Sequence, residues 1–407
     1  MLIEERRIEV SQLRTGMFVC RLDREWEGTP FLLQGFLVQD QDDIDQLTGC
    51  CRHVFIDVEK GHDADVPLQA GDREAAAPAQ TLRPEGGDSA RGMAAELANA
   101  AVAVERIAAD AVAIIDALRA GESVGHERIT SAVEPVVSSL VRNADAFFWL
   151  QALRRQGSYA YAHAVDSCAL SVALGRQLGL PDPVLRELAV GGLLLDIGMS
   201  TVAPGVLERP SPLDAAEWAL VRGHTRAGSA MYVDGDGKAS AIARSMILHH
   251  HERHDGSGYP DGFAGDDLPV WARIAGLVDS YDAMTSDRPY RAAMSRHDAL
   301  QAIYRDRDRL YQHALVEQFM QCLGVYPVGS LVEMNSGEVA VVMAQNPTRR
   351  LRPVLMLLTD AAKALRSYFQ PLDLMYVDRA GLPEAALHIV RGLPPGAYGL
   401  EPSELYL

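Results

Sequence analysis

The sequence is short of basic residues, and this shortage excludes a class of partner. Lysine and arginine total 38 against 55 aspartate and glutamate residues, which gives the 407-residue chain a formal net charge of −17. A broad nucleic-acid surface needs a basic stripe, so we expect no nucleic-acid polymer as a partner. A small anionic molecule would instead need a local cluster of arginine or metal.

Cysteine is also scarce, and long apolar runs are missing. The five cysteines are odd in number, scattered and free of CxxC spacing. This pattern predicts reduced thiols in the cytoplasm rather than a disulfide framework. No uninterrupted run of about 18 apolar residues occurs, so no membrane span is expected. The first residues, MLIEERRIEV, are charged and lack the apolar core of a signal peptide.

The length predicts two or three domains. Residues 158–324 show helical patterns with short loops and no clear strand alternation, which predicts a mainly α-helical protein. Hydrophobic residues make up 48% of the chain, which is ample for a core. We expect a small α+β module at residues 1–62, followed by a flexible linker at 63–92 and a helical connector at 93–157. A helical bundle is expected at 158–324 and a β-rich module at 325–407.

Strands are expected in the two small modules. The apolar run at residues 30–38 and the alternating run at 53–61 predict N-terminal strands, with a short helix between them. Near the other end, residues 328–333 and 338–343 flank the turn sequence Asn335-Ser336-Gly337. These features predict a β-hairpin.

The connector shows a helical spacing that has two interpretations. Apolar residues recur at four-three intervals over residues 97–118 and again over 129–150, with Gly121 between the two runs. Pro135 predicts a kink in the second helix. Two packed helices of a bundle would show this spacing, and so would a signalling helix or a coiled coil through which two copies form a homodimer.

Residues 248–290 concentrate side chains that bind metals. The stretch holds, in order, His249, His250, His251, Gly258, Tyr259 and Pro260. A helix is predicted after Pro269, and Asp279 and Asp282, three residues apart, share one of its faces. Imidazoles and carboxylates brought together in this way hold divalent transition metals.

The string HHERHDGSGYP, followed by VDSYDAMTSDRPYR, resembles the HD-GYP family of bacterial cyclic di-GMP phosphodiesterases. The first 62 residues resemble the domain of unknown function that often precedes HD-GYP domains. The resemblance implies a helical-bundle phosphohydrolase of the HD type that acts in second-messenger signalling. It also implies a binuclear centre of divalent transition metals, iron or manganese.

The resemblance carries over a set of site residues from separated helices. The metal ligands it implies are His163, Asp196, His224, His250, His251 and Asp279. Of these, Asp196, His250 and Asp279 are expected to serve catalysis directly. The substrate contacts it implies are Tyr259, Pro260, Asp282, Arg288 and Arg291. Asp282 has a second interpretation, as a residue that orients a metal ligand.

Three positions depart from the family pattern. Leu195 stands where the family has the histidine of its HD pair, and leucine cannot ligate a metal. Met199 stands where the family usually has a lysine that contacts phosphate, so that charge is lost. Tyr159 replaces a glutamate with which some members hold a third metal, so a third metal is not expected.

These departures leave three functions open. The first is a metal-dependent phosphodiesterase that opens cyclic di-GMP to the linear dinucleotide and/or GMP, with activity impaired by Leu195 and Met199. The second is a degenerate domain that acts as a cyclic di-GMP receptor, or docks a GGDEF-type diguanylate cyclase, without turnover. The third is an HD-type phosphohydrolase for other nucleotides.

Overall fold

The computed structural model describes residues 5–24, 36–38, 41–57, 89–153, 159–207, 213–233, 239–287, 292–346, 349–375 and 387–400. They belong to two compact units, Met1–Gly86 and Gly87–Leu407. The linker predicted at 63–92 lies outside the described residues except for its last four, and the strand predicted at 30–38 does so except for its last three.

The first unit is a small α+β module, as predicted. Its elements are β1 (Glu5–Glu9), η1 (Val10–Gln12), β2 (Phe18–Leu22), β3 (Phe36–Leu37), α1 (Gln41–Cys50) and β4 (His53–Asp57). The strands are antiparallel in the order β1-β4-β2-β3. Val54 and Ile56 alternate along β4 and are buried with Leu47 of α1, so this helix packs on the sheet.

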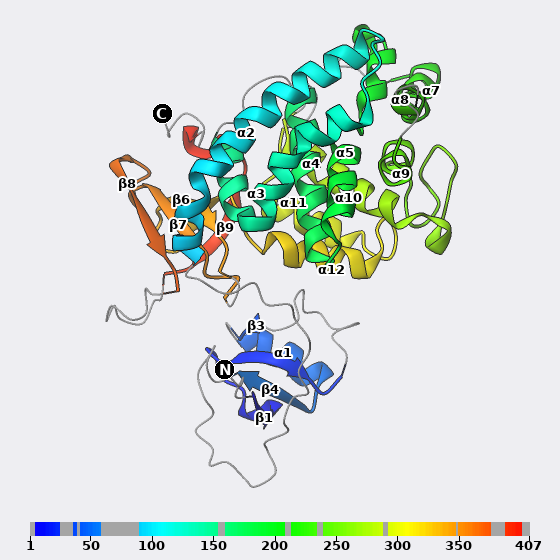
Figure 1. Ribbon diagram of the computed structural model, residues 1–407. Coiled ribbons are helices and arrows are strands. Elements are labelled where there is room, and N and C mark those ends of the chain that lie inside the picture. The colour runs from blue at the N-terminus through cyan, green and yellow to red at the C-terminus, as the bar shows by residue number, and fades with distance from the viewer. Residues whose placement is uncertain are drawn as a thin grey trace. The chain divides into compact units, whose positions relative to one another are not determined.

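The second unit is mainly helical, as predicted (Figure 1). Its helices are α2 (Ser89–Arg119), α3 (His126–Leu153), α4 (Tyr159–Gln177), α5 (Asp182–Leu193), η2 (Ile197–Thr201), α6 (Pro204–Leu207), α7 (Ala215–Arg222), α8 (His224–Val233), α9 (Ala241–His249), η3 (Gly265–Asp267), α10 (Val270–Thr285), α11 (Arg296–Arg305), α12 (His313–Leu323) and η5 (Ala397–Gly399). Across the described part of the chain, no helix is long and apolar enough to cross a membrane.

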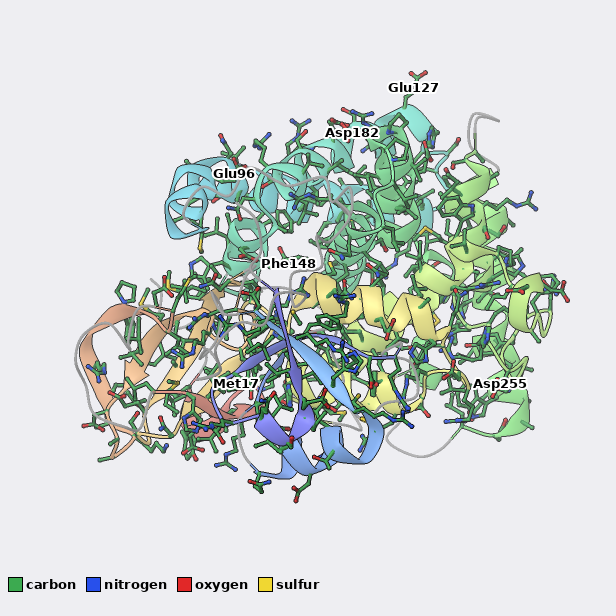
Figure 2. All side chains as sticks on the ribbon, turned by 90° about the horizontal axis from the view of Figure 1, so that it is seen from below. Met17, Glu96, Glu127, Phe148, Asp182 and Asp255 are labelled. Carbon is green, nitrogen blue, oxygen red and sulfur yellow. The ribbon has the colours of Figure 1, made fainter. Side chains whose placement is uncertain are left out.

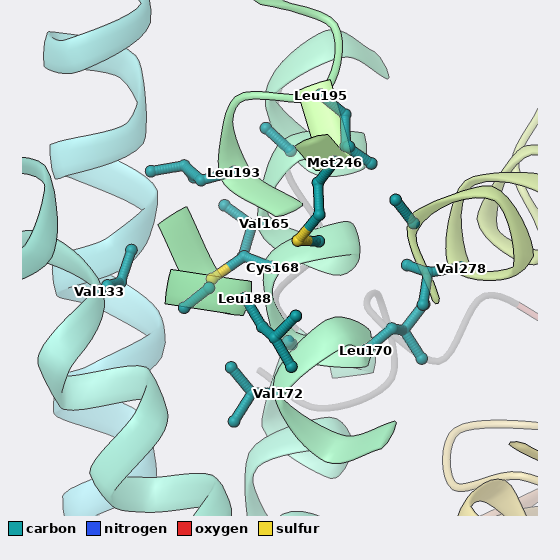
Figure 3. Close-up of a cluster of buried hydrophobic side chains, with 14 of the residues drawn as sticks. Val133, Val165, Cys168, Leu170, Val172, Leu188, Leu193, Leu195, Met246 and Val278 are labelled. Atoms are coloured by element: carbon teal, nitrogen blue, oxygen red, sulfur yellow. The ribbon is translucent and has the colours of Figure 1, made fainter. Parts of the chain in front are cut away.

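Helices α2 and α3 pack against each other and against the bundle, which matches the first interpretation of their spacing. Ile107 of α2 and Val133 of α3 are fully buried in one cluster with Leu188 of α5. Figure 3 shows Val133 and Leu188 in this cluster, together with Val278 of α10. The connector therefore shares its hydrophobic core with the helices that carry the candidate site.

The backbone of α3 departs from helical geometry at Asn143, and the kink predicted at Pro135 stays a prediction. Asn143 has φ −158° and ψ 102° inside the helix. Its Oδ1 accepts a hydrogen bond from the Ala146 amide at 3.0 Å. An extended residue whose side chain bonds the amide three positions ahead is a helix N-cap. The backbone is therefore interrupted by an asparagine that starts a new helical turn.

The C-terminal part of this unit is an antiparallel sheet. Its strands are β5 (Leu331–Met334), β6 (Val339–Ala344), β7 (Val354–Thr359), β8 (Leu365–Asp373) and β9 (Ile389–Leu393), in the order β8-β7-β6-β5-β9. The predicted hairpin is confirmed, because Glu333 pairs with Val339 across the turn. Phe148 of α3, labelled in Figure 2, packs against both the bundle core and the cluster that lies under the sheet.

Candidate metal centre

Five separate segments of the second unit carry the predicted metal ligands. His163 lies on α4, Asp196 follows α5, and His224 begins α8. The histidines at 250 and 251 follow the end of α9, and Asp279 lies on α10. The start of α10 was predicted correctly, since Pro269 is its N-cap. Because the ligands come from different helices, only the packing of those helices can bring them together.

Asp196 lies at the centre of the site, with each carboxylate oxygen directed at different imidazoles. Its Oδ1 lies 3.4 Å from His224 Nε2 and 3.7 Å from His250 Nε2. Its Oδ2 lies 3.6 Å from His163 Nε2. These separations are long for hydrogen bonds. Ligand atoms about 2.0–2.2 Å from a shared ion lie about 3–3.5 Å apart, so the arrangement suits a carboxylate between two ions.

The hydrogen bonds of His224 and His250 leave the same nitrogen available on both rings. His224 Nδ1 donates to the Val221 carbonyl at 2.5 Å, and His250 Nδ1 donates to the Ile247 carbonyl at 3.0 Å. In the neutral rings, Nε2 must then carry the lone pair. The two Nε2 atoms are only 3.2 Å apart. Two lone pairs at this distance repel unless a cation lies between them, and imidazole nitrogens of this kind suit divalent transition metals.

His163 is oriented by a buried carboxylate behind it. Its Nδ1 lies 2.7 Å from Oδ2 of Asp282, and both side chains are buried. Its Nε2 is thereby directed at Asp196 and at Asp279 Oδ1, which is 3.5 Å away. Asp282, for which substrate contact was one expectation, thus occupies the position of a residue that orients a ligand.

Charge in the site follows from burial and from these contacts. Burial alone would lower the pKa of His163, but the hydrogen bond and charge of Asp282, with the charges of Asp196 and Asp279, raise it to about 9. Burial would raise the pKa of Asp196, but its contacts with His224 and His250 and the charge of His163 hold it well below its usual value. Without metal the site therefore binds a proton that an incoming cation must displace.

His251 completes a group of four closely spaced ligands. Ligand atoms of Asp196, His224, His250 and His251 all lie within 4.8 Å of one another. His251 Nδ1 is also 3.7 Å from Asp279 Oδ2. Burial and the neighbouring histidines lower the pKa of His251 well below its usual value. A neutral imidazole is the form that ligates metals.

Leu195 adds no ligand to this group, because leucine has no atom that binds a metal. Its side chain is 1% exposed and belongs to the hydrophobic core, where Figure 3 places it beside Met246. Met199 is partly buried in η2. Neither residue supplies the ligand or the charge that the family pattern has at these two positions. Asp196 still reaches solvent, since a third of its side chain (33%) is exposed.

The glycine-rich loop beside the site is held by two carboxylates. Glu252 is buried, and its Oε1 accepts from the amides of Asp261 at 2.7 Å and Gly262 at 3.0 Å. Asp255 Oδ1 accepts from the Ser257 amide at 2.9 Å. From the sequence alone, each of these carboxylates could either orient a metal ligand or cap the turn. Their contacts are those of residues that cap turns.

Tyr259 and Pro260 lie on this loop, next to the metal ligands. The Tyr259 ring lies 4.7 Å from the His251 ring, centroid to centroid, at an interplanar angle of 31°. Pro260 is partly buried. His249 points to the loop as well, with Nε2 3.2 Å from Asp261 Oδ2, and is not among the four clustered ligands. Arg288 and Arg291 lie outside the described residues.

Sequence reasoning missed the glycines that let the helices approach. A Cβ on Gly198 would lie 2.0 Å from the His224 carbonyl oxygen and 2.5 Å from the Gly228 amide nitrogen. A Cβ on Gly276 would lie 2.8 Å from the carbonyl oxygen of His250. The segment after Asp196 and the helix that begins at His224 can therefore meet only where no side chain intervenes.

We expect Gly198→Ala to lose metal and stability. The added methyl group must push η2 away from α8, which separates Asp196 from His224, and overpacking of this kind costs about 1–3 kcal/mol. Metal content and the thermal midpoint would measure both effects. Gly205→Ala is the matched control, because a Cβ there has no atom within 4 Å. Full metal content and an unchanged midpoint in Gly198→Ala would contradict this account of the packing.

Family matches cover most of the chain. A domain of unknown function (DUF3391) matches residues 5–129, and an HD domain matches residues 139–315. The first match extends past the predicted N-terminal module into α2 and the start of α3. The second contains all six predicted metal ligands.

Three relatives are phosphodiesterases of cyclic dinucleotides by name. The chain is 36% identical over 372 residues to the cyclic di-GMP phosphodiesterase PA4108 of Pseudomonas aeruginosa, covering 91% of this chain and 89% of that protein. It is 33% identical over 168 residues to the cyclic di-GMP phosphodiesterase response regulator RpfG of Xanthomonas campestris, covering 41% and 44% of the two chains. It is 36% identical over 142 residues to the 3'3'-cGAMP-specific phosphodiesterase 3 of Vibrio cholerae, covering 35% and 30%.

Proposed function

Because this chain belongs to the HD-GYP family of HD-domain proteins, we propose that it is a metal-dependent phosphodiesterase of cyclic di-GMP. The product would be the linear dinucleotide, GMP or both. The observation that carries the proposal is the position of Asp196, with one oxygen toward His224 and His250 and the other toward His163. A hydrogen-bonded structural histidine cluster would not need a carboxylate shared in this way.

The residues fit a binuclear centre of iron or manganese. His224, His250 and His251 would hold one ion, and His163 with Asp279 would hold the other, while Asp196 would reach both. Bound ions of this kind neutralise charge on a phosphodiester and lower the pKa of a bound water toward neutrality. The protein contributes the fixed ring orientations, through the carbonyls of Val221 and Ile247.

The second ion has the weaker set of ligands. On its side of Asp196 the described residues supply His163 and Asp279, and Leu195 supplies nothing because leucine has no ligand atom. This observation favours a second candidate function, in which the domain binds cyclic di-GMP, or docks a diguanylate cyclase, without turnover. As a receptor, the second candidate would bind the same cyclic dinucleotide as the first, and no hydrolysis would follow.

Metal analysis alongside a turnover assay tests the proposal. The full chain would be prepared anaerobically with iron or manganese supplied, and cyclic di-GMP, 3'3'-cGAMP and cyclic di-AMP would be offered separately. We expect more than trace metal and release of the linear product from cyclic di-GMP. Binding of cyclic di-GMP by metal-loaded protein without any product would favour the receptor. Protein that stays metal-free and binds no cyclic dinucleotide would refute both candidates.

A further inference from the structure

An arginine beside the candidate metal centre has no acidic partner among the described residues. Arg222 ends α7, two residues before His224, and its Cζ lies 5.2 Å from the centroid of the Tyr259 ring. Within the described part of the chain, its guanidinium makes no ion pair or hydrogen bond. Arg226, one turn further on, differs because its guanidinium lies 2.6 Å from Asp261 Oδ1.

Tyr259 connects Arg222 to the metal ligands. One neighbour of its ring is the guanidinium, and another is His251, at 4.7 Å between ring centroids. The Tyr259 ring therefore contacts both the positive charge of Arg222 and His251, which is one of the four clustered ligands. In a chain with a net charge of −17, a free guanidinium at this place gives the site a local attraction for anions.

A large aromatic side chain lies one helical turn from Arg222. Trp218 is 48% exposed, although tryptophan is on average a highly buried residue. Residues four apart share a face of a helix, so Trp218 and Arg222 lie side by side. No residue of α7 is buried, which means that packing against the bundle does not explain the indole.

Helix α7 is held in place by its own cap. The carboxylate of Asp214 accepts from the amides of Ala216 and Glu217, both at 2.9 Å, and Glu217 bonds back to the Asp214 amide at 2.9 Å. This reciprocal capping box stabilises a short helix without burial. The helix thus presents an ordered, solvent-exposed pair of one cation and one indole at the rim of the site.

We propose that α7 binds the half of a cyclic dinucleotide that is remote from the phosphodiester at the metal centre. Arg222 pairs with the second phosphate, since a guanidinium fork matches phosphate oxygens. Trp218 stacks on one purine, since every base presents a flat face to an aromatic ring. This inference rests on the proposed function, and it assigns Arg222 and Trp218 as substrate-binding residues.

Calorimetry of cyclic di-GMP with metal-loaded full-length protein tests the inference. We expect Arg222→Ala to weaken binding about tenfold or more, which is about 1.4 kcal/mol. Trp218→Ala should weaken it about fivefold or more, and Trp218→Phe should restore most of the loss because a ring is kept. Metal content should stay at the wild-type value in all three variants, because neither side chain belongs to the ligand set.

Arg128→Ala is the matched control for charge. Arg128 is exposed, and among the described residues its guanidinium has no partner. It follows Glu127, which Figure 2 places well apart from Asp255 of the glycine-rich loop. This variant should bind cyclic di-GMP like the wild type. An equal loss in Arg128→Ala would show a general charge effect and overturn the assignment of Arg222.

Other outcomes separate this inference from the proposed function. If the wild type binds cyclic di-GMP and the Arg222 and Trp218 variants bind it equally well, the inference is wrong and the proposed function stands. If metal content falls together with affinity, the two residues support the metal centre and do not contact the ligand, which also overturns the inference. A metal-loaded wild type that binds no cyclic di-GMP overturns the proposed function and the inference together.

Discussion

Replacing Leu195 by histidine and Met199 by lysine together is expected to raise the turnover of cyclic di-GMP by one or more orders of magnitude. The imidazole would add a ligand beside Asp196, on the side of the site where the described residues supply His163 and Asp279. A fully held metal contributes several kcal/mol to the transition state, and about 1.4 kcal/mol is tenfold in rate. Substrate affinity should change less, because the predicted contacts of Arg288 and Arg291 are untouched.

A histidine at position 195 is also expected to lower the stability of the fold. Leu195 is 1% exposed and packs in the core, so an imidazole there loses apolar contacts and needs a polar partner. We therefore expect a lower thermal midpoint without metal and recovery of that midpoint when metal is added. Leu195→Met is the matched control, because it keeps an apolar side chain of similar volume and adds no ligand.

The rates decide between an impaired enzyme and a receptor. A low wild-type rate that rises steeply in the double variant, and not in Leu195→Met, would identify an impaired phosphodiesterase. A wild type as fast as the double variant would mean that the missing imidazole is tolerated. A double variant that binds metal and cyclic di-GMP but releases no product would refute a latent catalytic site, and the receptor would then be preferred.

His250→Ala is expected to remove metal from its side of the site and to lower turnover by about two orders of magnitude or more. His250 is fully buried and its Nε2 lies 3.2 Å from that of His224, so no neighbouring side chain can replace it without a rearrangement. Metal content per chain, measured together with the rate, would show whether both fall in parallel.

His249→Ala is the control for His250→Ala. The adjacent histidine bonds Asp261 in the glycine-rich loop and does not belong to the four clustered ligands. Its loss should leave the metal content at the wild-type value. If His249→Ala loses as much metal as His250→Ala, the imidazole of His250 has no special role. If neither variant loses metal, the ligand set itself is wrong.

The fold followed closely from local patterns in the sequence. Pro269 marked the start of α10, and the turn at 335–337 marked the hairpin, because proline and glycine restrict the backbone wherever they occur. The break at Asn143 was missed for a related reason. A proline can be recognised as a possible kink from the sequence alone, whereas Asn143 interrupts the helix only because its side chain accepts a hydrogen bond from the amide of Ala146.

The sequence also named the candidate ligands. His250, His251 and Asp279 lie in one long motif, and His163, Asp196 and His224 lie in separate short ones. It did not determine the individual roles of the site residues. Asp282 could contact substrate or orient a ligand, and only its 2.7 Å contact with His163 places it behind that ring. Arg222 and Trp218 gave no signal, since an arginine and a tryptophan four residues apart are common on solvent-exposed helices.

The sequence by itself determined that the chain is mainly helical and carries a histidine- and aspartate-rich HD-type domain, since residue identity and spacing set local structure and donor chemistry. Only the tertiary structure decided that one carboxylate, Asp196, lies between His163 on one side and His224 and His250 on the other, and that Leu195 is buried among apolar side chains. Those positions depend on how closely helices approach at Gly198 and Gly276. These distances depend on the packing of segments that are far apart in the chain, so local sequence patterns do not predict them.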